Sequence, residues 1–185
     1  MPDTAPPPQW IGALNRAEDA QALEMLNPVI ERSPWLAKRI LAQRPFPDSA
    51  TLAAALQQII LGLSDAEQLL LLRAHPELAP RAPGSMTDAS RREQGRLSLA
   101  RPEPARAHQL AALNRAYAAR FGFPFIIALH ALSDMDSVIA QFEGRLQNTP
   151  TDERARALAE VVSVVHARLA RVSDTGSAAP ATVTP

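Results

Sequence analysis

Apolar residues recur every three or four positions along most of this chain, a spacing that predicts amphipathic α-helices. In segment 52–63 they fall at i, i+4, i+7, i+8 and i+11, which places them on one helical face. Segment 158–172 carries a similar stripe of leucine and valine. Segment 69–72 is four leucines in a row, so we expect that helix to be apolar all round and central in the fold.

Capping residues indicate where these helices begin. Ser64 is followed three residues later by Glu67, and Asn15 by Glu18, which is the spacing of a capping box. A first helix is therefore expected to open at about Asn15. Ser or Thr residues placed before a helical turn, two of them followed directly by proline, predict further starts at Ser33-Pro34, Thr87 or Asp88, Ser133 and Thr149-Pro150.

One segment, Phe123 to Leu129, resembles a strand. It follows Gly122, which suits the left-handed position at the end of a helix. A single short strand has no partner to pair with, so we expect an extended, irregular and buried segment instead. The sequence therefore predicts an all-α fold, a single compact domain of about eight helices with one irregular buried segment.

The two ends of the chain differ in composition from the rest. Residues 1–9 include four prolines and predict a loose, disordered tail. Residues 173–185 are mainly Ser, Thr, Ala, Gly and Pro, with little to bury, and also predict disorder. The helical domain is expected to span residues 10–172, since 185 residues suffice for one full core but not for two ordinary domains.

Composition excludes several classes of function. Lys+Arg and Asp+Glu are both 19, so no net charge attracts nucleic acid or an acidic membrane surface. There is no cysteine, which excludes disulfides and thiolate metal sites. No apolar run reaches membrane-spanning length, and the N-terminus lacks the features of a signal peptide. We therefore expect a cytoplasmic protein that binds neither nucleic acid nor membrane.

His75 is the first candidate for chemistry. It directly follows the leucine-rich helix, and Pro76 forces it out of helical geometry. The negative end of a helix dipole favours an imidazolium, so this histidine is expected to exchange a proton near neutral pH. The alternative is a polar residue that merely ends a helix.

Ser90, Glu93 and Gln94 form a second candidate group. Their i, i+3, i+4 spacing places a hydroxyl, a carboxyl and an amide on one face in the first turns of a helix. Free backbone N–H groups there favour an anionic ligand. Leu97, at i+7 from Ser90, indicates that this face turns inward. The alternative is an ordinary solvated helix face.

Two further features could contribute to a binding site. The segment Phe121 to Leu129 is stiffened by glycine and proline, and its irregular backbone leaves N–H and C=O groups for a ligand. Otherwise it is a buried connection between helices. Arg168 lies at the edge of the last apolar stripe, where it can either reach inward to hold a carboxylate or lie along the surface. No phosphate-binding loop, HExxH motif or nucleophile elbow is present, so no metal and no cofactor is expected.

Taken together, these segments resemble one enzyme family, the OHCU (2-oxo-4-hydroxy-4-carboxy-5-ureidoimidazoline) decarboxylases. The resemblance runs from about Ile11 to Val172, and its segments follow one another in the same order as in the family. It rests on Glu31-Arg32-Ser33-Pro34-Trp35, Ala42-Gln43-Arg44-Pro45-Phe46, Leu69 to Ala74 running into His75-Pro76-Glu77-Leu78-Ala79, Ser90-x-x-Glu93-Gln94, Phe121 to Ile127, and Phe142-Glu143-x-Arg145-Leu146-x-Asn148.

The resemblance implies a cofactor-free carboxy-lyase that forms (S)-allantoin and CO2 in urate degradation. It implies His75 as the catalytic histidine and Glu93 as its acid/base partner. The substrate contacts it implies are Pro76, Ser90, Gln94, the backbone of Phe125, Ile126, Ile127, Ala128 and Leu129, and Arg168. Family members often carry Cys-Val-Arg where this chain has Ala128-Leu129-His130.

Two other functions are compatible with parts of the pattern. A cofactor-free ureide hydrolase also needs an acid/base pair, but it must activate water and releases no CO2. A non-catalytic helical interaction domain would expose an apolar stripe, whereas the stripes here are expected to form the core. The partner implied is a small ureidoimidazoline, and a homodimer is possible.

Overall fold

In the computed structural model, residues 9–80, 84, 86–99 and 102–175 are described. This part of the chain contains nine α-helices, one 3₁₀ turn and no strand, so the all-α prediction is confirmed. The elements are α1 (Gln9–Arg16), α2 (Asp19–Leu26), α3 (Pro34–Leu41), α4 (Ser49–Leu61), α5 (Asp65–Arg73), α6 (Asp88–Gly95), α7 (Pro104–Phe121), η2 (Leu129–Ala131), α8 (Met135–Arg145) and α9 (Pro150–Thr175).

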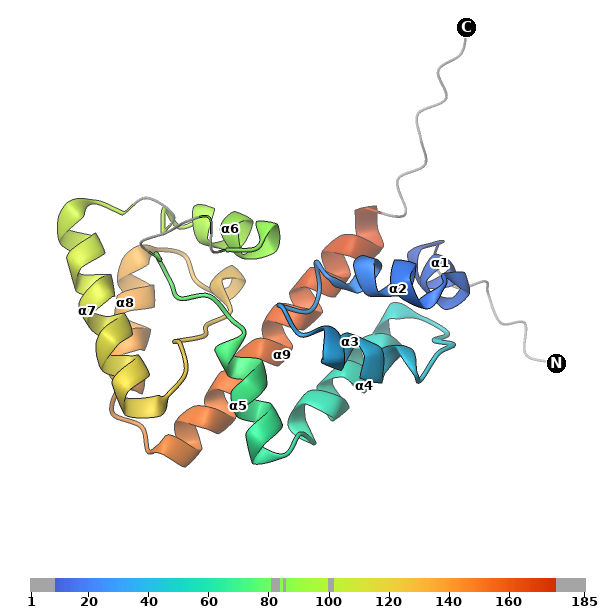
Figure 1. Cartoon of the computed structure of the whole chain (residues 1–185). Helices are drawn as coiled ribbons and strands as arrows, with labels where there is room; N and C mark the ends of the chain where they lie inside the picture. Colours follow the sequence, from blue (N-terminus) through green and yellow to red (C-terminus); the bar gives the residue numbers. More distant parts are fainter. Residues whose placement is uncertain (1–8, 81–83, 85, 100–101, 176–185) are drawn as a thin grey trace, which may run out of the picture.

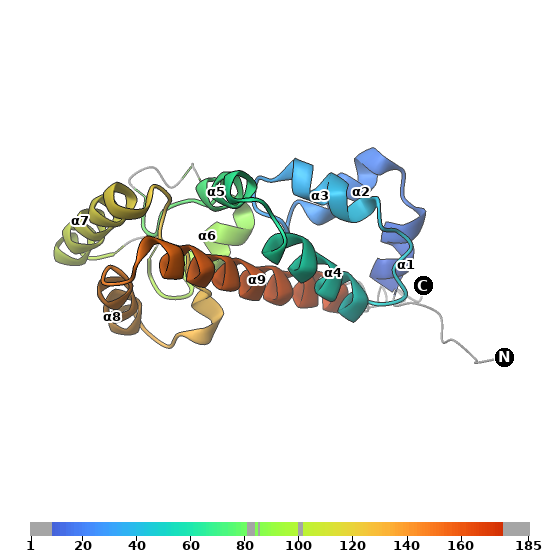
Figure 2. The same ribbon diagram turned by 90° about the horizontal axis from the view of Figure 1, so that it is seen from below.

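The last helix, α9, runs through the whole molecule. It contacts α1 and α4 near one end and α7 near the other, with α5 against its middle (Figure 1). Figure 2 shows α9 from below, with α7 and α8 gathered at one end and α1 to α4 at the other. Its Ala157, Val161 and Leu169 side chains are almost fully buried, as the apolar stripe predicts. Both groups of helices therefore share one core along α9. None of the described helices has the length and apolar character needed to cross a membrane.

Several predicted helix boundaries are confirmed. Ser64 and Glu67 form a reciprocal capping box at the start of α5. The Glu67 pKa is lowered to about 2, first by the hydrogen bond from Arg39 and then by those from Ser64. Pro34 occupies the first turn of α3. Gly122 ends α7 with φ of 78°, a left-handed conformation that glycine adopts without steric cost.

The prediction for the first helix is wrong. Asn15 lies inside α1 and does not cap α2, which begins at Asp19 after Glu18. The Asn15 amide instead accepts a hydrogen bond from the Phe46 N–H at 2.9 Å and donates one to its C=O at 2.7 Å. An asparagine three residues before a glutamate therefore did not mark a helix start here, because the Asn15 side chain binds the distant Phe46 backbone instead of a nearby N–H.

Other differences concern burial and boundaries. Leu71 and Leu72 are buried, but Leu70 is 55% exposed, so α5 is not apolar on all sides. The helix α8 is capped by Asp134, not by the preceding serine. Helical structure also extends slightly further than predicted, from Gln9 to Thr175. The remaining residues of both predicted tails lie outside the described part of the chain.

The segment from Phe123 to Leu129 is irregular and buried, as predicted. Phe125 stacks on Phe142 of α8, with ring centroids 3.9 Å apart, and Tyr117 of α7 packs edge-on against both rings. Arg145 donates to the Ile126 C=O at 2.7 Å from the far side. Aromatic packing and this buried hydrogen bond fix the segment between α7 and α8 in place of a β-sheet ladder.

Candidate active site

A small pocket of about 40 Å³ lies where the end of α5, helix α6, the 123–129 segment and α9 meet. It brings together residues up to 93 positions apart in the chain, since 168 minus 75 is 93. Nine of the eleven site residues predicted from sequence line it: His75, Pro76, Ser90, Gln94, Phe125, Ile126, Ile127, Leu129 and Arg168. The two others, Glu93 and Ala128, adjoin it without lining it.

His75 is held by the last turn of α5. Its Nδ1 lies 3.0 Å from the Leu71 C=O, and because a carbonyl can only accept, Nδ1 carries the hydrogen. In the neutral ring, the lone pair is therefore on Nε2. Burial lowers the His75 pKa, and it outweighs the opposing effects of the Leu71 hydrogen bond and the Glu31 charge.

The lowered pKa of His75 differs from the sequence-based expectation of an imidazolium. The position at a helix end was expected to favour the imidazolium, but burial favours the neutral ring more strongly than the Leu71 hydrogen bond and the nearby carboxylates favour the charged one. A neutral imidazole with a lone pair on Nε2 is a general base ready to accept a proton.

Ser90 presents an oxygen with a fixed hydrogen-bonding direction. Its Oγ lies 2.8 Å from Glu31 Oε2, and a carboxylate accepts, so the only Ser90 hydrogen points to Glu31. Arg168 Nη2 donates to the same Oγ at 3.2 Å. What remains on Ser90 is acceptor capacity, which suits an N–H group of a ligand.

Arg168 turns inward and is only 4% exposed, which decides between the two placements the sequence allowed. Its guanidinium binds Glu31 through Nη1 at 2.7 Å and Glu93 through Nε and Nη2 at 2.8 and 2.7 Å. Arg171 adds a further contact to Glu93 at 3.1 Å. Arg168 therefore lines the pocket while already paired with two carboxylates.

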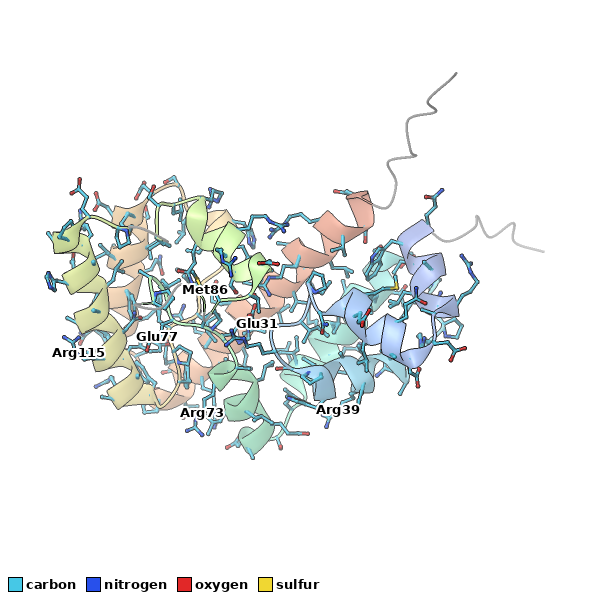
Figure 3. All side chains as sticks on the ribbon, turned by 45° about the horizontal axis from the view of Figure 1, so that its top comes forward. Glu31, Arg39, Arg73, Glu77, Met86 and Arg115 are labelled. Carbon is cyan, nitrogen blue, oxygen red and sulfur yellow. The ribbon has the colours of Figure 1, made fainter. Side chains whose placement is uncertain are left out.

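Glu31 is a site residue to which the sequence analysis assigned no role. It lies between α2 and α3, is 2% exposed, and is labelled near the centre of the molecule in Figure 3. Burial raises the Glu31 pKa, but the charge of Arg168 and hydrogen bonds from Arg168, Thr87 and Ser90 more than offset this and lower it. Its second oxygen, Oε1, is buried without a hydrogen-bond partner among the described residues. The helical periodicity contains no signal for it, because Glu31 is in a connection between helices.

Gln94 acts first on the protein itself. Its Oε1 accepts from the Ala79 N–H at 2.8 Å and its Nε2 donates to the Glu77 C=O at 2.9 Å. Ala79 has φ of 48°, a left-handed conformation that costs free energy for alanine, and these bonds hold it there. Gln94 thus fixes the turn after Pro76 and still has one N–H that can face the pocket.

The two predicted residues outside the pocket lining have defined partners. Ala128 donates its N–H to Glu160 at 2.8 Å and accepts from the Ala131 N–H at 3.0 Å, so both of its backbone groups are occupied. The Glu93 carboxylate faces Arg168 and Arg171. It does not line the pocket, and its charge nevertheless acts on His75.

The arrangement combines a neutral base, a hydroxyl that accepts, an arginine and a mainly apolar wall. This set of groups can bind the polar atoms of a small ring and move one proton. Among the described residues, no group of three or more His, Asp or Glu side chains is arranged to hold a metal ion.

Comparison with known proteins agrees with this chemistry. A model of the OHCU decarboxylase family matches residues 15–170. The 2-oxo-4-hydroxy-4-carboxy-5-ureidoimidazoline decarboxylase of Haloferax volcanii is 35% identical over 157 residues, covering 85% of this chain and 92% of that protein. The enzyme of the same name from Xenopus laevis is 32% identical over 161 residues, covering 86% and 91%.

Two crystal structures have the same fold. One, of (S)-allantoin synthase, is 28% identical with a TM-score of 0.64, and covers 88% of this chain. This chain spans about half of that protein, 53% of its length. The other, an OHCU decarboxylase in the presence of (S)-allantoin, has a TM-score of 0.67 at 21% identity and covers 85% and 99% of the two chains. With the family model matching most of its length, this chain belongs to the OHCU decarboxylase family.

Proposed function

We propose that this protein converts 2-oxo-4-hydroxy-4-carboxy-5-ureidoimidazoline to (S)-allantoin and CO2 without a cofactor. The observation that carries the proposal is the neutral His75 imidazole, whose Nδ1 is fixed by Leu71 and whose Nε2 can accept a proton. The names of the Haloferax and Xenopus relatives support the same reaction.

The substrate itself supplies the electron sink. Its ring carbon C4 bears a hydroxyl and a carboxylate and adjoins C5, which is doubly bonded to a ring nitrogen. When the bond from C4 to the carboxylate breaks, its electron pair forms a C4–C5 double bond, and the former C=N pair moves onto nitrogen, which takes a proton. Loss of the C4 hydroxyl proton and addition of a proton to C5 then give allantoin. No thiamine, pyridoxal or metal is needed for this sequence.

The residue roles follow from this chemistry. His75 accepts the C4 hydroxyl proton, while Glu93 is the acid/base partner that controls the second proton. Ser90 accepts from a substrate N–H, and Arg168 attracts the substrate carboxylate, which competes with its two protein carboxylates. The remaining contacts are made by Pro76, Gln94 and the backbone of the 125–129 segment.

The extent of the domain and its setting are part of the proposal. We propose a functional domain of residues 10–172 that acts on a small molecule in the cytoplasm, not on nucleic acid or at a membrane. A homodimer is compatible with the site, because the pocket is lined by residues of one chain. Light scattering of the purified protein tests that state.

The experiment generates the unstable substrate in situ from urate with the two preceding enzymes of urate oxidation. CO2 release and the circular dichroism of allantoin are followed with and without this protein. Faster CO2 release and (S)-allantoin are expected, and they should persist in EDTA. A ureide hydrolase would consume the substrate without releasing CO2, and a non-catalytic interaction domain would leave the spontaneous rate unchanged.

A further inference from the structure

We propose that Glu160 is a positioning residue, whose carboxylate fixes the 125–129 backbone so that the peptide groups of Ile127 face the substrate ring. The inference rests on the proposed function and adds a residue that lies outside the pocket. Glu160 is on α9, is 8% exposed, and does not line the pocket itself.

Two buried side chains hold the segment from one side. Glu160 Oε2 accepts from the Ala128 N–H at 2.8 Å, and Arg145 Nη1 donates to the Ile126 C=O at 2.7 Å. Arg145 is also bound to Glu153, at 2.5 Å, and lies 4.0 Å from Glu160. An acceptor and a donor thus hold the two consecutive peptide groups on either side of Ile127.

The backbone geometry indicates where the intervening residue points. In an extended segment, the N–H and C=O groups of successive residues point to opposite sides. The Ile126 C=O faces Arg145 and the Ala128 N–H faces Glu160. In a planar trans peptide the C=O of one residue and the N–H of the next point in opposite directions, so the N–H and C=O of Ile127 both point the other way. Neither of these groups has a hydrogen-bond partner among the described residues, and the Ile127 side chain lines the pocket.

A free N–H and C=O on the same residue form a donor and acceptor pair. This pair is complementary to the edge of a cyclic ureide, which presents a C=O beside an N–H. Both peptide groups are rigid, so little entropy is lost when the ring binds. The proton that sets the stereochemistry at C5 must reach one face of that ring, and a ring whose C=O and N–H are both bound cannot turn over to present its other face.

Helix α9 links this contact to the rest of the site. Glu160, Val164 and Arg168 are four residues apart, so they lie along one face of the helix. Glu160 contacts the 125–129 backbone, Val164 lines the pocket, and Arg168 binds the carboxylates of Glu31 and Glu93.

The two oxygens of Glu160 have separate partners, which makes a controlled experiment possible. Oε2 binds the Ala128 N–H, whereas Oε1 binds Arg156 on the same helix at 2.7 to 2.9 Å and lies 4.0 Å from Arg145. Arg156 is 54% exposed in its side chain and has no contact with the pocket. Glu160→Ala removes the hydrogen bond to Ala128 and the charge that faces Arg156 and Arg145. Glu160→Gln keeps an acceptor for Ala128, and Arg156→Gln removes only the ion pair.

The measurements are kcat and KM for CO2 release and the optical purity of allantoin, at a temperature well below the Tm of every variant. For Glu160→Ala we expect kcat/KM to fall by about 10²-fold, the effect of a misplacement of about 1 Å, and the allantoin to lose optical purity. Glu160→Gln should recover most of both, and Arg156→Gln should resemble wild type. Glu160→Asp, which keeps the charge but is too short to reach Ala128, should behave like Glu160→Ala and serves if that variant does not fold.

A folded Glu160→Ala or Glu160→Asp with wild-type kcat, KM and optical purity would overturn the inference. So would a Glu160→Gln variant as impaired as Glu160→Ala, because the charge and not the acceptor would then matter. A lower Tm with unchanged kinetics would show that Glu160 only stabilises the fold. A wild-type protein that releases no CO2 would instead overturn the proposed function, and the inference with it.

Discussion

Glu31 and Arg168 form a buried ion pair, with 2.7 Å between Oε2 and Nη1, although they are 137 positions apart in the chain. Their side chains are 1% and 4% exposed. The pair joins the connection after α2 to the C-terminal half of α9, and Ser90 is hydrogen bonded to both partners. The acceptor character of Ser90 and the position of Arg168 therefore both depend on Glu31.

Glu31→Gln should destabilise the protein and reduce its activity. Loss of one partner of a buried pair costs about 3 kcal/mol, which lowers the Tm of a domain of this size by about 6–12 °C. The new amide can also donate, so the Ser90 hydroxyl can rotate and its acceptor character is lost. Thermal unfolding and CO2 release check this, with Glu24→Gln at an exposed position as the control. Unchanged kcat/KM in a folded Glu31→Gln would show that Glu31 does not shape the site.

His75→Asn should lower kcat by about 10²–10⁴-fold while changing the Tm little. The base on Nε2 is lost, but an asparagine amide can still donate to the Leu71 C=O. Stopped-flow or coupled assays of CO2 release measure the effect. His108→Ala, at an exposed position on α7, is the control and should keep full activity. Wild-type turnover by folded His75→Asn would show that another group accepts the proton.

The activity of the wild type should extend to more acidic pH than an ordinary histidine allows. The base must be neutral, and burial lowers the His75 pKa, so the acid limb of kcat/KM is expected below about 6.5. A pH profile in buffers of constant ionic strength checks this. An acid limb at or above the ordinary value would mean that the group being titrated is not the His75 imidazole.

Stability should fall in two steps as the pH is lowered. Unfolded His75 takes up a proton near pH 6.5, before the folded form does, so stability decreases from that pH down to the lowered folded pKa. Glu31 also has a lowered pKa, so its contribution is present above about 4.3 and is lost below it as the carboxylate is protonated. Denaturant unfolding across pH measures both, and His75→Asn should remove only the upper step.

Glu93→Gln should slow the reaction and reduce the optical purity of allantoin. If Glu93 controls the proton that reaches C5, a planar intermediate is otherwise quenched by water from either face. Circular dichroism at matched conversion, corrected for the spontaneous reaction, detects this. Arg171→Gln removes the more exposed partner of Glu93 and is a suitable comparison. Purely (S) product at the wild-type rate from Glu93→Gln would exclude it from the proton path.

Local features of the fold could be predicted from the sequence, and long-range pairings could not. The Ser64 capping box and the Gly122 helix end depend on neighbours within a few residues, and both were predicted. The role of Asn15 was not, because its partner is 31 positions away. The same limit explains the site. The residues that line the pocket belong to recognisable segments, whereas Glu31 and Glu160 act through partners on other elements, which spacing along the chain cannot indicate.

The register of α9 limits how the length of this chain can vary. Inserting one residue between Glu160 and Arg168 would turn everything beyond it by about 100° and shift it by about 1.5 Å along the axis. Arg168 would then leave Glu31 and Glu93, while Glu160 stayed against Ala128. Insertions and deletions are thus far less tolerable between Glu160 and Arg168 than in the connections between helices. Eight residues of a single helix set the distance from the 125–129 backbone to the carboxylates of Glu31 and Glu93.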